Sequence, residues 1–427
     1  MSAPREAFAG AAYALLLRLL APAYALRLWW RGRAEPLYRE RIAERFGLYR
    51  DAPSTGWVWV HAVSLGETRA AAALVAALRD ARPGMRLLLT HGTATGRAAG
   101  QELLRPGDRQ TWLPYDTPGA TRRFCAHFRP AVGVLMETEV WPNLLRAARA
   151  APITMVLANA RLSAHSLVRG QRLGALLRPA IDGLALVLAQ GDADAQRLRA
   201  AGARTVEVAG NLKYDLTPEP DQLALGAAWR ALVDRDVVLA AVTREGEEAQ
   251  LIDAWVRRMP PRALLLIVPR HPQRFDEVAA LVRAAGLSLV RRSSWDDTPP
   301  ADALAAQVWL GDSMREMALY YASAKVALLG GSFAPFGGQN LIEAAACGCP
   351  LVMGPSTFNF SEAAELSLAA GASLRVDDIA QGVALVDELL VDPARLAALS
   401  AQALRFAAQH RGAAQRMAQR IAPLLRN

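Results

Sequence analysis

A carboxylate stands in the first half of the chain where a strand-like apolar run gives way to a helix. Glu67 ends the segment HAVSLGE, which follows the apolar residues 57–60 and precedes an alanine-rich stretch at 69–78. The plain interpretation is a helix cap, because the helix dipole favours negative charge at its amino end. The alternative is a carboxylate aimed at a ligand. This segment alone leaves both interpretations open.

A second acidic pair and a lysine follow later apolar runs of the same half. Glu137 and Glu139 stand in METEVWPNLL, and two residues so spaced point to opposite faces if the backbone is extended. At most one of them is therefore expected to face a ligand, and a helix-capping pair is the alternative. Lys213, in GNLKYD, follows the last apolar run of this half and is expected at the mouth of a ligand cleft.

Glycine-rich and basic segments take comparable places in the second half. In GGSFAPFGGQNLIEAAACGCPLVMGP, residues 330–355, glycines expose backbone N–H groups and a helix opens near Asn340, which suits phosphate or sugar hydroxyls. Glu343 can accept two hydrogen bonds from a ribose diol. Arg270 could pair with a phosphate, and GDSMREM at 311–317 could contact a base through its backbone. A solvated glycine-rich turn and an ordinary surface arginine are the alternatives.

The elements that must position these residues are parallel strands. Short runs that are apolar on both faces, such as WVWVHAV and AVGVLMETE, alternate with helical stretches, as buried strands of a parallel sheet do. The alternation breaks at 211–222, which contains Pro218 and Pro220, and then restarts with DVVLAAVT. We therefore predict an α/β chain with two Rossmann-like, doubly wound domains facing a cleft. Ligands of such sheets bind at the carboxyl ends of the strands, where nearly all of the polar clusters fall.

The amino-acid composition limits which binding partners and cofactors the chain can be expected to have. The chain has 427 residues, 52% of them apolar, and 49 Lys and Arg against 40 Asp and Glu, which indicates two domains and affinity for anions. No recognised nucleic-acid motif accompanies the positive charge, so no nucleic-acid partner is expected. The three cysteines and six histidines show neither a disulfide framework nor a metal-ligand spacing, and we predict no metal site and a reducing compartment.

The amino end is apolar enough to meet a membrane. Residues 7–30 approach the length of about 20 residues that crosses a bilayer, and several arginines follow Trp29 and Trp30. This order predicts an uncleaved anchor with a cytoplasmic body. Arg18 within the apolar stretch could instead favour a helix lying in the membrane interface. An internal helix of a soluble protein is the third alternative.

The motifs together describe a two-domain glycosyltransferase of the GT-B type, and in this order they resemble one family. HAVSLGE, ETEVWPN, NARLS, GNLKYD, EGEE, PRHPQR and GGSFAPFGGQN are similar to the 3-deoxy-D-manno-octulosonic acid (Kdo) transferases of lipopolysaccharide synthesis, from about Leu37 to Phe360. The resemblance implies transfer of Kdo from CMP-Kdo to a phosphorylated lipid A precursor, at the cytoplasmic face of the inner membrane. Because the leaving CMP phosphate is already charged and Arg270 with helix amino ends can hold that charge, we expect no metal requirement and no cofactor.

The resemblance also implies residue roles. Glu67 resembles the proton acceptor of the family, and Glu137 and Lys213 resemble its transition-state stabilisers. The residues that resemble the contacts to the cytidylate are Pro269, Arg270, Met314, Arg315, Glu316, Asn340, Leu341, Ile342 and Glu343. The sequence departs from the family pattern at Arg244, Arg315, Gln339, Leu341 and Ser356.

The predicted division follows from these assignments. Residues 1–36 form the anchor and a basic collar, 37–214 an acceptor-binding domain, 215–391 a CMP-sugar-binding domain, and 392–427 helices that pack across the domains. Inversion at the sugar needs one general base and a stabilised leaving phosphate, which matches the residue set. A nucleotide-sugar epimerase and a membrane-associated binding protein without catalysis are the competing functions.

Overall fold

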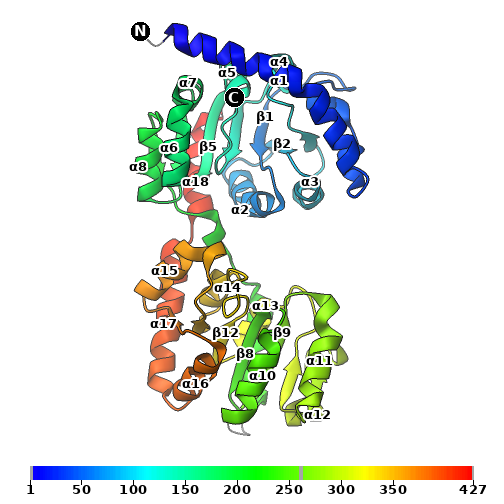
Figure 1. The fold of residues 1–427 in the computed structure, drawn as a ribbon, viewed down its shortest axis with the longest axis vertical. Helices are drawn as coiled ribbons and strands as arrows, with labels where there is room; N and C mark the ends of the chain where they lie inside the picture. The colour runs from blue at the N-terminus through cyan, green and yellow to red at the C-terminus, as the bar shows by residue number, and fades with distance from the viewer. Residues whose placement is uncertain (1–2, 259–262, 426–427) are drawn as a thin grey trace. The chain divides into compact units, whose positions relative to one another are not determined.

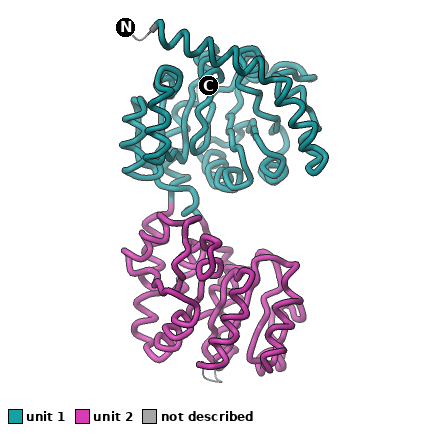
Figure 2. The backbone as a smooth tube through the Cα atoms, in the orientation of Figure 1, with its two compact units in different colours: residues 1–215, 412–427 teal, residues 216–411 magenta. Residues whose placement is uncertain are grey.

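The computed structural model describes residues 3–258 and 263–425 and divides the chain into two compact units (Figure 2). Unit 1 comprises residues 1–215 and 412–427, and unit 2 comprises residues 216–411. The chain therefore leaves unit 1 after Asp215 and returns to it at Gly412. The four-part division expected from the sequence stays a prediction.

Unit 1 is built around one parallel sheet of seven strands (Figure 1). The strands are β1 (Trp57–His61), β2 (Arg86–His91), β3 (Arg109–Trp112), β4 (Val132–Met136), β5 (Thr154–Ala160), β6 (Leu186–Ala189) and β7 (Val206–Val208). The helices are α1 (Ala3–Arg31), α2 (Leu65–Ala81), α3 (Ala94–Gly100), α4 (Pro118–Phe128), α5 (Pro142–Ala150), α6 (Ala164–Arg172), α7 (Gly174–Asp182), α8 (Asp192–Ala200) and α18 (Ala413–Ile421). Short 3-10 helices are η1 (Pro36–Arg39), η2 (Ile42–Phe46), η3 (Gln101–Leu103), η4 (Leu212–Tyr214) and η8 (Ala422–Leu424).

The strand order of this sheet fixes where a ligand can bind. The order is β3-β2-β1-β4-β5-β6-β7, so the direction of winding reverses between β1 and β4. A crevice opens at the carboxyl ends of the strands at such a reversal. The loops that follow β1 and β4 carry Glu67 and the pair Glu137 and Glu139 to this place.

Alternate side chains of each strand pack against opposite helical layers. In β1, Val58 and Val60 pack with residues of α2 and α18, whereas Trp57 and Trp59 pack with residues of α4, α5 and α7. Burial of each such side chain stabilises the fold by about 1.5–3 kcal/mol. Because helices cover both faces of the sheet, its strands are apolar on both sides, which is the pattern that predicted buried parallel strands.

Unit 2 repeats the architecture with a second parallel sheet of seven strands. The strands are β8 (Val237–Thr243), β9 (Leu264–Pro269), β10 (Leu289–Arg291), β11 (Val308–Leu310), β12 (Val326–Leu329), β13 (Leu351–Met353) and β14 (Ser373–Arg375). The helices are α9 (Pro220–Leu232), α10 (Glu247–Arg258), α11 (Phe275–Ala284), α12 (Ala301–Ala305), α13 (Met317–Ser323), α14 (Leu341–Ala346), α15 (Ser361–Ala369), α16 (Ile379–Leu390) and α17 (Pro393–His410), with 3-10 helices η5 (Pro272–Arg274), η6 (Arg292–Ser294) and η7 (Phe358–Phe360). The order β10-β11-β9-β8-β12-β13-β14 reverses between β8 and β12. The prediction of two doubly wound parallel sheets is confirmed.

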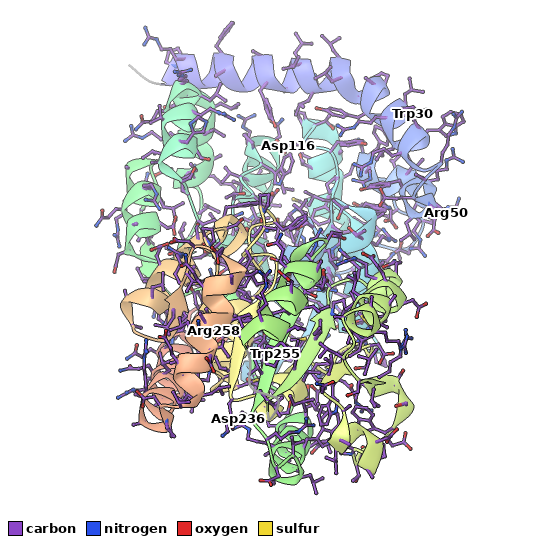
Figure 3. The ribbon with its side chains drawn as sticks, turned by 60° about the horizontal axis from the view of Figure 1, so that its bottom comes forward. Trp30, Arg50, Asp116, Asp236, Trp255 and Arg258 are labelled. Atoms are coloured by element: carbon purple, nitrogen blue, oxygen red, sulfur yellow. The ribbon has the colours of Figure 1, made fainter. Side chains whose placement is uncertain are left out.

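The apolar helix α1 lies along unit 1 (Figures 1 and 3). Tyr13 donates a hydrogen bond to Asp116 Oδ2 at 3.0 Å, and the ring of Tyr24 stacks on Tyr115 with centroids 5.3 Å apart. Leu28 is buried with Tyr38 and Trp112. The predicted apolar amino-terminal helix is confirmed, and these contacts hold it against the unit.

The outer side of α1 is apolar and uncovered. The exposed large side chains of the helix are Phe8, Leu15, Leu16, Leu19, Leu20, Leu26, Trp29 and Trp30. By length and composition α1 could cross a membrane, and only 11% of its apolar window is buried.

One carboxylate joins the two places where the chain passes between the units. Asp215 accepts hydrogen bonds from the backbone N–H groups of Gly412, Ala413 and Ala414. These are the free N–H groups at the start of α18, so Asp215 caps a helix that is distant in sequence.

Candidate active site

Glu67 lies in the first turn of α2, and its carboxylate takes part in capping that helix. Ser64 is the N-cap residue, and its Oγ accepts a hydrogen bond from Glu67 N at 3.4 Å. Glu67 Oε2 accepts a hydrogen bond from Val63 N at 2.6 Å. The second oxygen, Oε1, forms no hydrogen bond within the part of the chain that the structure describes. The carboxylate therefore caps with one oxygen and keeps the other available.

Glu137 and Glu139 follow β4 in a turn, so the assumption of an extended backbone does not hold here. Glu137 has φ of 56°, a left-handed conformation that is uncommon outside glycine and that often marks functional sites. Glu137 Oε2 accepts a hydrogen bond from Arg161 Nε at 2.9 Å, and Glu139 Oε2 accepts one from Trp141 Nε1 at 2.7 Å.

The structure brings Glu67, Glu137 and Glu139 into one electrostatic cluster. Burial is the main cause that raises the pKa of Glu67, and the nearby charge of Glu137 adds to it. Burial, with the charges of Glu67 and Glu137, raises the pKa of Glu139 to about 7. Glu139, beside the other two carboxylates, is therefore partly protonated near neutral pH. Such a set suits acid–base chemistry.

A buried histidine lies beneath this cluster. His61 Nδ1 is 2.9 Å from Thr90 Oγ1, and burial lowers the pKa of His61 to about 3, so the ring is neutral. Its Nε2 lies 3.9 Å from Glu139 Oε2 and has no hydrogen-bond partner among the described residues. The contact is therefore not an ion pair.

Lys213 lies in η4, which packs against α2. Asn211 Oδ1 accepts a hydrogen bond from Lys213 N at 3.0 Å, and Asn159 Oδ1 accepts one from Leu212 N at 3.0 Å. The side chain of Lys213 is exposed, and its ammonium forms no ion pair with any residue that the structure describes. The geometry thus places the backbone of Lys213 beside the helix that carries Glu67 and leaves the ammonium unengaged.

In unit 2 the loops at the strand reversal are joined by a buried glutamate. Glu247 Oε2 accepts hydrogen bonds from Arg244 N at 2.9 Å and from Gly331 N at 2.7 Å. Its Oε1 accepts from Phe333 N at 3.1 Å and from Ala334 N at 3.3 Å. This carboxylate holds the glycine-rich loop after β12 against the turn after β8.

The glycine-rich loop leads to two predicted donor contacts. Asn340 is the N-cap of α14, and its Oδ1 accepts a hydrogen bond from Ile342 N at 3.2 Å. Glu343 is half-buried, burial raises its pKa, and its carboxylate forms no hydrogen bond within the described chain. Leu341 and Ile342 are buried core residues, and α14 has only six residues. The carboxylate of Glu343 is thus available to a ligand here.

The remaining predicted donor contacts lie after β9 and β11. Pro269 is buried at the end of β9. Arg270 is exposed, and its backbone N–H donates a hydrogen bond to Thr243 O at 3.0 Å. Met314 is 60% exposed, and Arg315 is exposed with φ of 67°. Glu316 is engaged inside the unit, because its Oε1 accepts a hydrogen bond from Arg292 at 2.9 Å.

Three of the departures from the family pattern gather on the glycine-rich loop. The guanidinium of Arg244 lies 4.2 Å from the centre of the Phe336 ring. Ser356 Oγ accepts a hydrogen bond from Gly337 N at 3.0 Å. The side chain of Gln339 packs beside Gly331. The described residues include no group of three or more His, Cys, Asp or Glu side chains that could hold a metal ion.

Sequence reasoning missed four residues of these sites. For Glu139, the expectation of an extended strand allowed at most one carboxylate of the pair to face a ligand, whereas the structure brings both into the cluster. Arg161, His61 and Glu247 each lie in a quoted motif, NARLS, HAVSLGE and EGEE, but received no role. The available signal was their position at or just beyond the end of a strand-like run: His61 ends β1, Arg161 directly follows β5, and Glu247 begins the helix after β8.

Two doubly wound units, with carboxylates at the strand reversal of one and a glycine-rich loop at that of the other, define a glycosyltransferase of the GT-B architecture. A family profile described as 3-deoxy-D-manno-octulosonic-acid transferase matches residues 40–216. The chain belongs to the Kdo transferase family. It is 49% identical to the 3-deoxy-D-manno-octulosonic acid transferase of Bordetella pertussis, over 95% of this chain and 96% of that protein.

A second relative agrees with this assignment, and a solved structure agrees with the fold alone. The 3-deoxy-D-manno-octulosonic acid transferase of Haemophilus influenzae is 33% identical, over 91% of this chain and 92% of that protein. HepE from Anabaena, solved in complex with UDP, shares the fold with a TM-score of 0.54 at 15% identity, over 87% of this chain and 99% of that one. Membership of the Kdo transferase family disfavours the epimerase alternative.

Proposed function

We propose that this chain transfers Kdo from CMP-Kdo to a phosphorylated lipid A precursor with inversion at the sugar, and that Glu67 is the general base. The observation that carries this proposal is the half-free carboxylate of Glu67 at the strand reversal of unit 1, in a chain that belongs to the Kdo transferase family.

The chemistry needs one proton transfer and one displacement. Glu67 takes the proton of the acceptor hydroxyl, the oxygen bonds to the anomeric carbon of Kdo, and the bond from that carbon to the phosphate oxygen of CMP breaks. The raised pKa of Glu67 makes its carboxylate a better base near neutral pH. A carboxylate at Glu137 can stabilise positive charge on the sugar, and the unpaired ammonium of Lys213 can stabilise negative charge on the leaving phosphate.

Unit 2 supplies the proposed donor contacts. The guanidinium of Arg270 suits the phosphate of CMP, and the unpaired carboxylate of Glu343 suits the ribose hydroxyls. Two further strand ends contribute to the proposed set: β9 ends at Pro269, and β11 is followed by Met314 and Arg315. The other members of the set are Glu316, Asn340, Leu341 and Ile342. Because CMP leaves with a charged phosphate that Arg270 can bind, the reaction proposed here needs no metal.

We place the chain at the cytoplasmic face of the inner membrane, with α1 lying in the interface. Tyr13, Tyr24 and Leu28 hold one side of α1 on unit 1, which supports a helix that lies along the membrane surface rather than across the bilayer. The other side exposes leucines and Trp29 and Trp30, which suit the boundary between headgroups and acyl chains.

A product-mass experiment tests the function. The full chain in detergent is incubated with CMP-Kdo and a phosphorylated lipid A precursor, with and without EDTA. The expected product is the precursor with one or more added Kdo residues at similar rates in both buffers. CMP binding without any product would favour the binding-protein alternative, and loss of transfer in EDTA would contradict the metal-free step.

A further inference from the structure

The helical segment that follows β5 is basic and uncovered. Residues 161–181 contain no Asp or Glu, and their basic residues are Arg161, His165, Arg169, Arg172 and Arg178. No residue of α6 is buried. A helix of a folded unit normally buries an apolar stripe, so α6 is exposed in an unusual way.

The positive charges of α6 are not neutralised by carboxylates. Arg169 donates a hydrogen bond to His165 Nε2 at 2.7 Å, and Arg172 forms no hydrogen bond or ion pair within the described chain. Guanidinium groups free of carboxylates are suited to bidentate contacts with phosphate. Val168 and Leu173, each 55% exposed, add apolar surface between the charges.

The position of α6 connects two features of unit 1 (Figure 1). On one side, Arg161 precedes the helix and bonds to Glu137 in the carboxylate cluster. On the other side, α6 packs on α7, and α7 packs on the apolar helix α1. A ligand with its acyl chains near α1 can therefore pass its polar part over α6 to reach the carboxylates.

We infer that α6 is the docking surface for the headgroup of the acceptor, an acylated and phosphorylated sugar, with Arg169 and Arg172 binding phosphate. This inference rests on the proposed function and names the part of unit 1 that selects the acceptor. The inference is based on charge complementarity. Arg169 and Arg172 are exposed and have no carboxylate partner in the described chain, so they can attract an anionic headgroup whose acyl chains lie near α1. Bulk anionic lipid is the rival source of the same phosphate chemistry.

The test compares two acceptors in the full chain. Arg169→Gln, Arg172→Gln and the double variant are assayed at saturating CMP-Kdo with the phosphorylated precursor and with the same precursor after removal of its phosphates. The KM for the phosphorylated acceptor is expected to rise about tenfold or more in the double variant, since the loss of charge-assisted hydrogen bonds to phosphate weakens binding by about that factor. The KM for the dephosphorylated acceptor should change little, so the variant loses the preference for phosphate.

A matched control removes two arginines elsewhere. Arg105 and Arg129 are exposed and precede β3 and β4, at the edge of the sheet opposite the carboxyl ends. The variant Arg105→Gln with Arg129→Gln removes the same charge and should leave both KM values within about twofold. CMP binding, measured by calorimetry, reports the folding of unit 2 in every variant.

Each outcome decides between the proposals. Transfer by the wild-type chain with an unchanged KM in the double variant overturns the docking surface alone. An equal rise for both acceptors, or an equal loss of binding to vesicles of anionic lipid without acceptor, assigns α6 to the bulk membrane surface instead. Absence of transfer by the wild-type chain overturns the proposed function and the docking surface with it.

Discussion

Glu67 Oε2 lies 2.6 Å from the backbone nitrogen of Val63 and accepts its hydrogen. The carboxylate thereby satisfies an N–H group just before the first turn of α2, a structural task that fixes the side chain. Since Oε1 remains unengaged in the described chain, capping and proton transfer can belong to the same carboxylate. The two interpretations of HAVSLGE are therefore compatible, and a variant must separate them.

Glu67→Gln separates basicity from capping. The amide oxygen can still accept the hydrogen of Val63, but the side chain can no longer take a proton. We expect turnover to fall by about 10²–10⁴ with CMP binding retained. Steady-state assays of transfer and calorimetry of CMP binding check this result.

Ser64→Ala is the matched control, because it removes the N-cap oxygen and leaves the proposed base. Its free energy of unfolding should fall by about 1 kcal/mol while turnover stays within a few-fold. Near-normal turnover in Glu67→Gln would return this residue to capping alone.

Glu139→Gln should alter the pH dependence of stability. Burial raises the pKa of Glu139 to about 7 in the folded chain, from a model-compound value of 4.5. Between these values the folded state holds a proton that the unfolded state has lost, so wild-type stability falls as pH rises from about 5 to 7. A permanently neutral Gln removes this slope, and the variant should gain on the order of 2 kcal/mol relative to wild type over that range.

Thermal unfolding of both proteins at pH 5 and pH 8 measures the effect. The difference in melting temperature between variant and wild type should be larger at pH 8. Equal differences at the two pH values would show that Glu139 ionises normally in the folded chain.

Glu343→Gln should weaken the binding of ribose hydroxyls. The carboxylate has no hydrogen-bond partner within the described chain, so it can accept from both hydroxyls of CMP. Wild-type affinity should fall about tenfold or more for 2′-deoxy-CMP or 3′-deoxy-CMP, and the variant should show a smaller loss. Glu362→Gln, an exposed glutamate at the start of α15, is the control. Equal losses in variant and wild type would place Glu343 away from the ribose.

Chemical labelling can determine whether α1 lies in the membrane interface or crosses the bilayer. Glu6→Cys near the start of α1 and Arg50→Cys in the body of unit 1 are treated with an impermeant maleimide in intact spheroplasts and after permeabilisation. An interfacial helix on the cytoplasmic side predicts labelling of both only after permeabilisation. Labelling of Glu6→Cys alone in intact spheroplasts would mean that α1 crosses the bilayer. The unmodified chain gives the background from its own cysteines.

The sheets were predictable because each buried strand leaves a run that is apolar on both faces. Val58 to Val60 pack in two opposite layers, and the short length of such runs and their alternation with helical stretches favour buried parallel strands over segments of a buried helix. The sequence also predicted Glu67 and the glycine-rich loop at the carboxyl ends of strands, because each directly follows a buried run. The strand order, and with it the reversal points, came only from the structure.

The detailed arrangement of the sites depends on backbone conformations that could not be predicted from the residue types. The left-handed conformation of Glu137 turns the chain after β4 and brings Glu139 into the cluster, against the expectation for an extended pair. Arg315, one of the residues at which the sequence departs from the family pattern, has φ of 67°, a left-handed conformation that glycine adopts more readily than other residues. Contacts between distant segments, such as Glu247 with Gly331, follow only from the folded sheet.

The hydrogen bonds of Asp215 to the start of α18 have a consequence for modularity. They hold the two ends of the intervening 216–411 segment at a single spot on unit 1, so this segment is a complete insertion with adjoining termini. This segment could be removed or replaced by joining the chain with a short linker between residues 215 and 412, without changing the connectivity of the sheet in unit 1. Residues 215 and 412 are thus natural junctions for chimeras that exchange one whole unit among relatives.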